Sequence, residues 1–188
     1  MTDSEGKWRL FIAVPLPKDV KQRLEEWCST QKDRLKFKKW VHPEDYHITV
    51  QFLGDTSPER LGELEASLKR ASAGTLPFTL EAAGFGTFGR PANPSVLWAG
   101  IRGDGAGLEG LHRRVASENS ALGYVPEDRK FSPHITLARK YREEARLNPE
   151  ALEGSPVFGS WTADRLVVYR THMHERPMYK EVLSVPWV

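Results

Sequence analysis

The chain has 188 residues, a size that suits one domain or two small lobes sharing a hydrophobic core. Hydrophobic residues make up 39% and charged residues 28%, as expected of a soluble globular protein. The net charge of +2 gives no strong signal for nucleic acid or membrane binding, and the single cysteine, Cys28, excludes an internal disulfide framework. The N-terminus is too polar for a signal peptide and no apolar run could span a bilayer, so we predict a cytoplasmic protein without a membrane anchor.

The N-terminal part of the chain predicts a strand followed by a helix. Residues 8–14, WRLFIAV, are rich in strand-forming side chains and end at the sequence PLP. A helical pattern begins at Pro17, with one apolar face and charged residues on the other; the apolar face consists of Val20, Leu24, Trp27 and Cys28. On that face we expect Cys28 to be a small buried residue rather than a nucleophile.

A second strand and a second helix follow. The sequence YHITVQFLG, residues 46–54, predicts a strand that ends at Gly54. Ser57 is the predicted N-cap of the next helix, with Pro58 as its first residue and Gly74 as its stop. A leucine stripe along this helix predicts that it packs against the core.

The second half of the chain contains two strands joined by the turn-rich sequence RPANPS, an amphipathic helix, another strand and a final pair of strands. Because several strands adjoin through short turns, we predict an α+β fold with antiparallel sheets rather than a doubly wound parallel sheet. Each half contains a strand, an amphipathic helix and then a strand with the sequence H-I-T. The predicted elements of the second half cover residues 78–89, 96–101, 108–122, 130–140, 162–173 and 178–186.

The sequence H-I-T occurs twice, starting at His47 and at His134. In a strand, residues i and i+2 point to the same face, about 7 Å apart. His47 would therefore share a face with Thr49, and His134 with Thr136, while the intervening isoleucines anchor the opposite face. Both copies can be read as ordinary strand sequences that agree by chance. Two copies at matching places in two similar halves favour a shared site instead.

Two histidines and two hydroxyls in one site suit acid–base chemistry on a phosphodiester. Histidine gives or takes a proton near neutral pH, and a pair can supply one base and one acid. Hydroxyls donate hydrogen bonds to charged phosphate oxygens without adding charge of their own. The attacking and leaving oxygens of a phosphodiester lie on opposite sides of phosphorus, one for each histidine. Nothing in this arrangement requires a metal ion or a cofactor.

Other motifs are better explained by structure. GFGTFG, residues 84–89, matches a dinucleotide-binding pattern, but prolines and a strand follow it, so we predict a hairpin. GDGAG, residues 103–107, lacks the Lys-Ser/Thr of a P-loop and is expected to be a strand-to-helix connection. His172 and His174 have no second pair of metal ligands near them. His112, among arginines on a helix, is expected at the surface.

The doubled motif resembles the 2H phosphoesterases, a family named for two H-x-T/S-x motifs. The sequence is most similar to the bacterial and archaeal RNA 2′,3′-cyclic phosphodiesterases, once called 2′-5′ RNA ligases. The resemblance covers most of the chain. The matching segments are RLFIAVPLP, KWVHPEDYHITVQFLGD, VLWAGI, RKFSPHITLARK and MYKEVLSVPWV.

The resemblance implies a two-lobed, pseudo-symmetric 2H phosphoesterase fold, with helices outside antiparallel sheets and a central cleft. Residues 1–188 would form a single domain of two similar lobes, each contributing one motif. By the same resemblance, His47 would be the proton donor to the leaving ribose oxygen and His134 the proton acceptor that activates water. Thr49 and Thr136 would hold the phosphate oxygens.

Two further residues, Phe52 and Arg139, lie five positions after the histidines. The resemblance implies that Phe52 contacts the base and Arg139 the phosphate. Strand alternation places both on the face opposite the histidines, so they reach the site only through a bulge or at the end of a strand. The chain also departs from the family pattern at three positions: His42, Tyr46 and Ser95, the last of which stands where the family often has an arginine.

We therefore expect hydrolysis of RNA 2′,3′-cyclic phosphodiester ends to 2′-phosphomonoesters, without a metal ion. Reversible 2′-5′ RNA ligation is an alternative, because it is the same chemistry run backwards. A non-catalytic protein that binds RNA ends is a third interpretation, although a pure binder has no need of two proton carriers. The expected partner is an RNA or oligonucleotide with a cyclic phosphate end, and we expect a monomer that does not bind membranes.

Overall fold

The structure, a computed structural model, describes residues 6–187 and shows an α+β fold built on one antiparallel sheet. Within these residues nine strands join in the order β7-β4-β5-β6-β3-β1-β8-β9, with β2 paired to β6. The strands are β1 (Trp8–Pro15), β2 (Phe37–Trp40), β3 (His47–Thr56), β4 (Phe78–Arg90), β5 (Asn93–Gly103), β6 (His134–Tyr141), β7 (Val157–Ala163), β8 (Arg165–Thr171) and β9 (Tyr179–Pro186). The helices are α1 (Lys18–Gln31), α2 (Leu61–Ser72) and α3 (Gly105–Ser120), with short 3₁₀ helices at Pro43–Asp45, Pro58–Arg60 and Pro149–Leu152.

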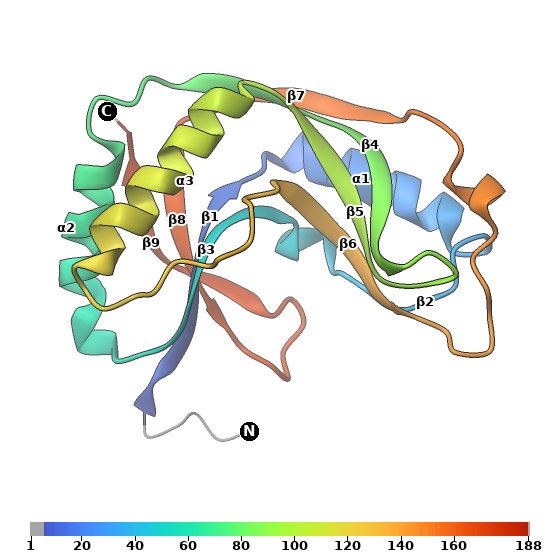
Figure 1. Ribbon diagram of the computed structural model, residues 1–188, viewed down its shortest axis with the longest axis horizontal. Helices are drawn as coiled ribbons and strands as arrows, with labels where there is room; N and C mark the ends of the chain where they lie inside the picture. The colour runs from blue at the N-terminus through green and yellow to red at the C-terminus, as the bar shows by residue number, and fades with distance from the viewer. Residues whose placement is uncertain (1–5, 188) are drawn as a thin grey trace.

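The strand order is symmetric about β3 and β6 (Figure 1). These two strands run antiparallel and meet where Ile48 pairs with Ile135. Outward from β3 lie β1, β8 and β9, and outward from β6 lie β5, β4 and β7. In chain order, β1–α1–β3 matches β5–α3–β6, so each H-I-T strand follows a strand and a helix. The predicted α+β class and antiparallel pairing are confirmed, with all the pairings joined in one sheet.

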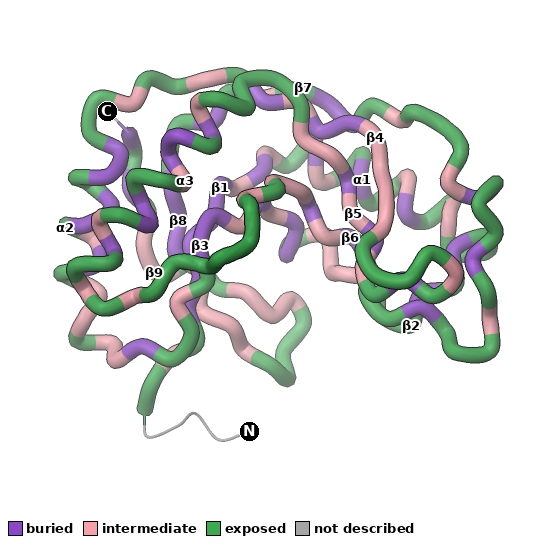
Figure 2. The backbone as a smooth tube through the Cα atoms, in the orientation of Figure 1, coloured by how far each residue is buried: buried purple, intermediate pink, exposed green. Residues whose placement is uncertain are grey.

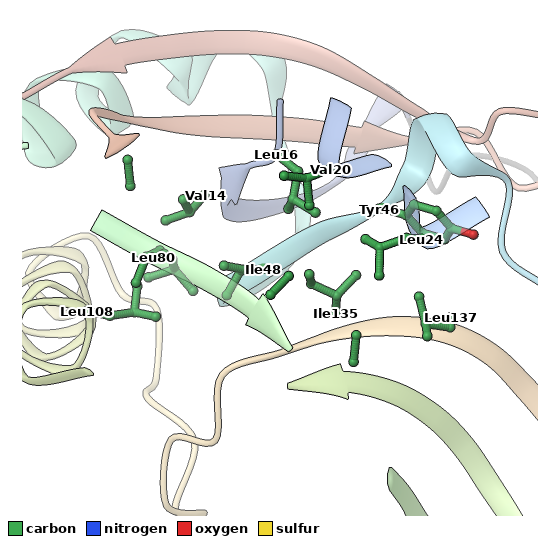
Figure 3. Close-up of a cluster of buried hydrophobic side chains, with 14 of the residues drawn as sticks. Val14, Leu16, Val20, Leu24, Tyr46, Ile48, Leu80, Leu108, Ile135 and Leu137 are labelled. Atoms are coloured by element: carbon green, nitrogen blue, oxygen red, sulfur yellow. The ribbon is translucent and has the colours of Figure 1, made fainter. Parts of the chain in front are cut away.

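The two central isoleucines belong to the hydrophobic core (Figure 3). Ile48 and Ile135 are each 0% exposed, and burying such a side chain contributes about 1.5–3 kcal/mol. Helix α1 adds Val20 and Leu24 to this core, on the predicted apolar face. Helices α2 and α3 lie side by side, and buried segments alternate with exposed ones along both (Figure 2). The core thus holds both motif strands by the face opposite their histidines.

Cys28 is buried on α1, as predicted. The Tyr46 hydroxyl donates a hydrogen bond to its sulfur over 3.7 Å. Burial raises the pKa of the Cys28 thiol to about 11, so the thiol stays protonated at neutral pH. Tyr46, one of the departures from the family pattern, is therefore a core residue.

Two local predictions, on Gly54 and His112, were wrong. Gly54 has a φ of 71°, but β3 continues past it to Thr56. Ser57 is the N-cap, as predicted, with Pro58 as the first helical residue, but the helix opens with a 3₁₀ turn before α2 and Ser57 makes no side-chain cap hydrogen bond. His112 is half-buried on α3: its Nδ1 lies 2.9 Å from the Val50 carbonyl oxygen, and its ring stacks on Phe131. The short strands β2 and β7 were not predicted.

The glycine-rich motifs have the predicted structural roles. GFGTFG lies inside β4, which pairs with β5 as a hairpin. GDGAG leads into α3, where the Asp104 carboxylate accepts a hydrogen bond from the Gly107 N–H over 2.8 Å. The chain's own side chain thus caps this helix N-terminus.

Candidate active site

The two H-I-T segments have the same local structure. His47 and Thr49 are half-buried on β3, on either side of the buried Ile48. His134 and Thr136 have the same burial pattern on β6. Because β3 and β6 are antiparallel, the two histidines lie on opposite sides of the Ile48–Ile135 pair. The structure therefore brings both predicted pairs together at the centre of the sheet.

Both motif strands contain a bulge immediately after the threonine. Val50 has no partner in the register between β3 and β1, where Thr49 pairs with Ala13 and Gln51 with Ile12. In β6, Leu137 is likewise skipped by the pairing with β5. One extra residue reverses the side-chain alternation that follows it. The two bulges thus occur at equivalent positions of the two motifs.

These bulges bring Phe52 and Arg139 to the face of the histidines. Phe52 is 60% exposed, and its ring centroid lies 6.0 Å from that of Phe11. The Phe11 ring in turn contacts the His47 ring, with 4.7 Å between the centroids. In β6, the bulge at Leu137 places Arg139 on the same face as Thr136 and His134. The bulge that the family resemblance required is therefore present in each strand.

Each histidine is oriented by the carbonyl two residues before it. His47 Nδ1 lies 2.7 Å from the Asp45 carbonyl oxygen, and His134 Nδ1 lies 2.7 Å from the Ser132 carbonyl oxygen. A carbonyl oxygen only accepts, so Nδ1 carries the proton in both rings. In the neutral rings Nε2 is then the basic nitrogen. The Thr49 hydroxyl, 2.9 Å from His47 Nε2, donates to it.

The surroundings of the two histidines differ. His47 lies among Phe11, Tyr169 and Tyr179, with ring centroids 4.7–6.0 Å away. The His134 ring forms a T-shaped contact with the Phe88 ring, with 5.0 Å between the ring centroids. The His47 ring therefore sits in an apolar cluster, and the His134 ring is less enclosed.

Burial lowers the pKa of His47 to about 4 and also lowers the pKa of His134. Nearby positive charge from Arg139 acts in the same direction on both rings. Both histidines are consequently neutral at pH 7 in the free protein. A bound phosphodiester anion would raise both pKa values, so one ring would take up a proton together with the substrate.

Asp45 is a functional candidate that the sequence did not reveal. Its buried carboxylate accepts hydrogen bonds from the backbone N–H groups of Met178, over 3.0 Å, and Tyr179, over 3.2 Å. Its own carbonyl orients His47. One residue thus connects His47 to the start of β9, which carries the Tyr179 ring that packs on His47. In the sequence, only the position of Asp45 two residues before His47 could have pointed to this role.

The two remaining departures from the family pattern also have structural roles. His42 Nδ1 accepts a hydrogen bond from the Glu44 N–H and caps the 3₁₀ helix before His47. The Ser95 hydroxyl donates to the Phe88 carbonyl oxygen over 3.2 Å and so holds the β4–β5 hairpin. Neither residue contacts the motif histidines in the described contacts.

Residues 6–187 contain no group of three or more His, Cys, Asp or Glu side chains arranged to hold a metal ion. His172 forms an ion pair with Glu175, with 3.1 Å between Nδ1 and Oε2. In the described part of the chain, no helix is both long and apolar enough to cross a membrane.

The arrangement suits proton transfer on both sides of a bound anion. Two imidazoles present Nε2 from opposite sides of the central isoleucine pair. Two threonine hydroxyls and one guanidinium lie on the same face and can donate to anionic oxygens. This combination fits a phosphodiester, whose attacking and leaving oxygens lie in line on opposite sides of phosphorus.

Comparison with known proteins agrees with this chemistry. A family model described as LigT like Phosphoesterase matches residues 14–98 and 103–179. The RNA 2′,3′-cyclic phosphodiesterase of Geobacillus stearothermophilus is 39% identical over 177 residues, which are 94% of this chain and 56% of that relative. The chain thus spans little more than half the length of that relative. The Bacillus subtilis (strain 168) protein of the same name is 31% identical over 175 residues, 93% of each chain.

Solved structures share the fold. The crystal structure of Escherichia coli LigT complexed with 3′-AMP has a TM-score of 0.77 at 24% identity, covering 96% of this chain and 98% of that one. The structure of TT0787 from Thermus thermophilus has a TM-score of 0.75 at 27% identity, covering 95% of this chain and 97% of that one. These likenesses confirm the predicted 2H phosphoesterase fold. On the sequence and fold evidence together, the chain belongs to the LigT-like phosphoesterase family.

Proposed function

We propose that this protein hydrolyses 2′,3′-cyclic phosphodiesters at the ends of RNA to 2′-phosphomonoesters. The observation that carries the proposal is the pair of histidines, oriented alike through Nδ1 and presented from opposite sides of the Ile48–Ile135 pair. The names of the relatives from Geobacillus stearothermophilus and Bacillus subtilis support the same substrate class. We also propose that the two halves act as one domain, which their continuous sheet supports.

In the proposed reaction, His134 Nε2 accepts a proton from water as the water oxygen attacks phosphorus. The bond from phosphorus to the ribose 3′-oxygen breaks, and His47 donates a proton to that oxygen. The product carries a 2′-phosphate and a free 3′-hydroxyl. Thr49, Thr136 and Arg139 hold the phosphate oxygens as charge builds up, and Phe52 stacks on the base.

Because His47 is neutral in the free protein, it must be protonated when the substrate binds. The apolar cluster around His47 disfavours the charged ring, whereas the phosphodiester anion favours it. Protonation of the acid is therefore coupled to the presence of the anion. The Thr49 hydroxyl, which donates to Nε2 in the free protein, must then turn toward the phosphate.

The test uses an oligonucleotide with a 2′,3′-cyclic phosphate end and the purified full chain, with and without EDTA. We expect hydrolysis in both conditions, and a phosphatase that accepts only 3′-phosphates should release nothing from the product. His47→Ala and His134→Ala should each lower turnover by about 10²- to 10⁴-fold with unchanged circular dichroism. Full activity in either variant would refute two-histidine catalysis, and loss of activity in EDTA would refute the metal-free mechanism. Phosphate release by the 3′-specific enzyme would reverse the acid and base assignment.

A further inference from the structure

The proposed reaction assigns no role to His112, a half-buried histidine on α3. Its Nδ1 donates a hydrogen bond to the Val50 carbonyl oxygen over 2.9 Å, since a carbonyl oxygen only accepts. Its ring stacks on that of Phe131, with 4.1 Å between the centroids and 3° between the planes. Val50 directly follows the first H-I-T motif, and Phe131 lies three residues before His134. One side chain thus contacts the chain just after one motif and just before the other.

The carbonyl that His112 binds belongs to the bulged residue of β3. Val50 is skipped in the pairing with β1, as Leu137 is skipped in the pairing of β6 with β5. In β6 the Leu137 carbonyl accepts a hydrogen bond from the backbone N–H of Val41, over 2.9 Å. In β3 the equivalent carbonyl is bonded by the imidazole of His112. The β3 bulge, unlike the β6 bulge, therefore depends on the identity of one side chain.

The β3 bulge decides where Phe52 points. The extra residue reverses the side-chain alternation and brings the exposed Phe52 ring to the face of the histidines, beside Phe11. Without a donor at position 112, the carbonyl of the buried Val50 would lose its partner, and a regular strand would turn Phe52 to the opposite face. His112 therefore controls the ring that contacts the base in the proposed reaction.

The stack on Phe131 reaches the second motif. Within the described residues, the backbone of residues 125–133 makes no hydrogen bond to another backbone group. The Phe131 ring packs against the core and joins this connection to α3. The next residue, Ser132, supplies the carbonyl oxygen that orients His134 Nδ1 over 2.7 Å. A ring held at Phe131 therefore fixes the group that sets the direction of His134.

We propose that His112 is a positioning residue for both motifs: its Nδ1 acts on Phe52 through the Val50 carbonyl, and its ring acts on His134 through Phe131. This role rests on the cyclic phosphodiester hydrolysis proposed above. The donor contact governs binding of the base, whereas the stacking contact governs a catalytic histidine. Because the two contacts use different parts of one side chain, different substitutions separate them.

The experiment compares two substitutions of the same residue. His112→Phe keeps a flat ring for Phe131 and removes the donor. His112→Asn keeps an N–H donor bonded to Cγ, as Nδ1 is, and removes the ring. Arg113→Ala, at the exposed next residue of α3, is the matched control. For each variant kcat and KM are measured with 2′,3′-cyclic AMP, and amide hydrogen exchange is followed at residues 49–53 and 130–134.

We expect His112→Phe to raise KM about tenfold and to change kcat less than about threefold, because a base contact stabilises the bound substrate and the transition state alike. In the Phe52→Ala background the same change should raise KM less than about twofold, because the ring that it positions is gone. His112→Asn should instead lower kcat about three- to tenfold and leave KM near that of the parent protein. Arg113→Ala should match the parent protein in both constants.

Amide hydrogen exchange gives a readout that does not depend on the reaction. We expect faster exchange at residues 49–53 in His112→Phe and at residues 130–134 in His112→Asn, and neither change in Arg113→Ala. Three results would each overturn the positioning role: the same changes of kcat and KM in the two His112 variants, an undiminished effect of His112→Phe beside Phe52→Ala, or exchange that is unchanged or raised equally in both segments. Failure of the parent protein on 2′,3′-cyclic AMP would overturn the proposed function, and the exchange pattern would then decide whether His112 holds the two segments.

Discussion

At the scale of single residues, the two histidines share a tautomer and differ in surroundings. Each donates from Nδ1 to the carbonyl of residue i−2, which frees Nε2 for chemistry. The apolar rings around His47 disfavour its charged form, and burial acts on His134 in the same direction. The protonation of this pair in the free protein should therefore control how activity depends on pH.

We predict a bell-shaped dependence of kcat/KM on pH, with its optimum below pH 6.5. Catalysis needs one neutral and one protonated histidine, and kcat/KM reports the ionisations of the free protein. Both pKa values are lowered from 6.5, so the singly protonated pair becomes scarce as pH rises through that value.

Arg139→Gln removes a cation that lowers both pKa values and should move the optimum to higher pH. Assays of 2′,3′-cyclic AMP hydrolysis from pH 4 to 8 test this, and an optimum above pH 7 in the parent protein would contradict it.

Thr49 offers a second prediction at this scale. Thr49→Val removes the hydroxyl 2.9 Å from His47 Nε2, whereas Thr49→Ser keeps a hydroxyl at the same position. A neutral hydrogen bond contributes about 0.5–1.5 kcal/mol, so we expect Thr49→Val to lower kcat about three- to tenfold, much less than His47→Ala. Thr49→Ser should retain most of the activity. A loss in the Ser variant without a loss in the Val variant would show that the methyl group, not the hydroxyl, is what matters.

At the scale of elements, the site depends on how β3, β6 and β9 are joined. The bulges at Val50 and Leu137 turn Phe52 and Arg139 toward the histidines. Asp45 ties the backbone at the start of β9 to the segment before β3, so Tyr179 is held against His47. This connection bridges parts of the chain that are far apart in sequence.

We predict that Asp45→Asn lowers both stability and kcat. The carboxylate accepts one backbone N–H on each oxygen, and an amide has only one acceptor oxygen, so one partly buried donor would lose its partner. Such a loss costs about 1–3 kcal/mol. Urea unfolding measures the stability change, and Asp33→Asn, at an exposed position just after α1, is the matched control. A drop in kcat with KM unchanged would indicate that His47 is misplaced, whereas full stability and activity would show that the connection is dispensable.

Much of the fold and the centre of the site could be predicted from local patterns. The H-I-T repeat identified the histidine and threonine positions because strand alternation is a property of consecutive residues. The bulges were not predictable in this way, because they depend on which residues of β1 and β5 pair with the motif strands. Asp45 was missed for the same reason, since its partners lie more than 130 positions away. Strand β2 was missed because its lysines, Lys38 and Lys39, are exposed and give no apolar alternation.

At the scale of the whole molecule, the site imposes a cost on stability that depends on pH. In the folded protein the pKa of His47 is about 4, and in the unfolded chain it returns to about 6.5. Between these values the unfolded chain binds more protons, so the free energy of unfolding rises with pH across this window and falls as the solution is acidified. The lowered pKa of His134 acts with the same sign.

We predict that acidification from pH 7 to pH 5 removes on the order of 2 kcal/mol of stability through His47 alone. The His47→Gln variant lacks this titration, so its free energy of unfolding should fall less over the same range, and the difference between the two proteins isolates His47 from every other group that titrates. Urea unfolding at pH 7, 6 and 5 measures both curves. Parallel curves would mean that the His47 ring is charged in the folded protein at pH 5, and that the apolar cluster of Phe11, Tyr169 and Tyr179 does not hold it neutral. A smaller loss in the variant would show that the same burial that sets the reactivity of His47 limits the pH range in which the fold is stable.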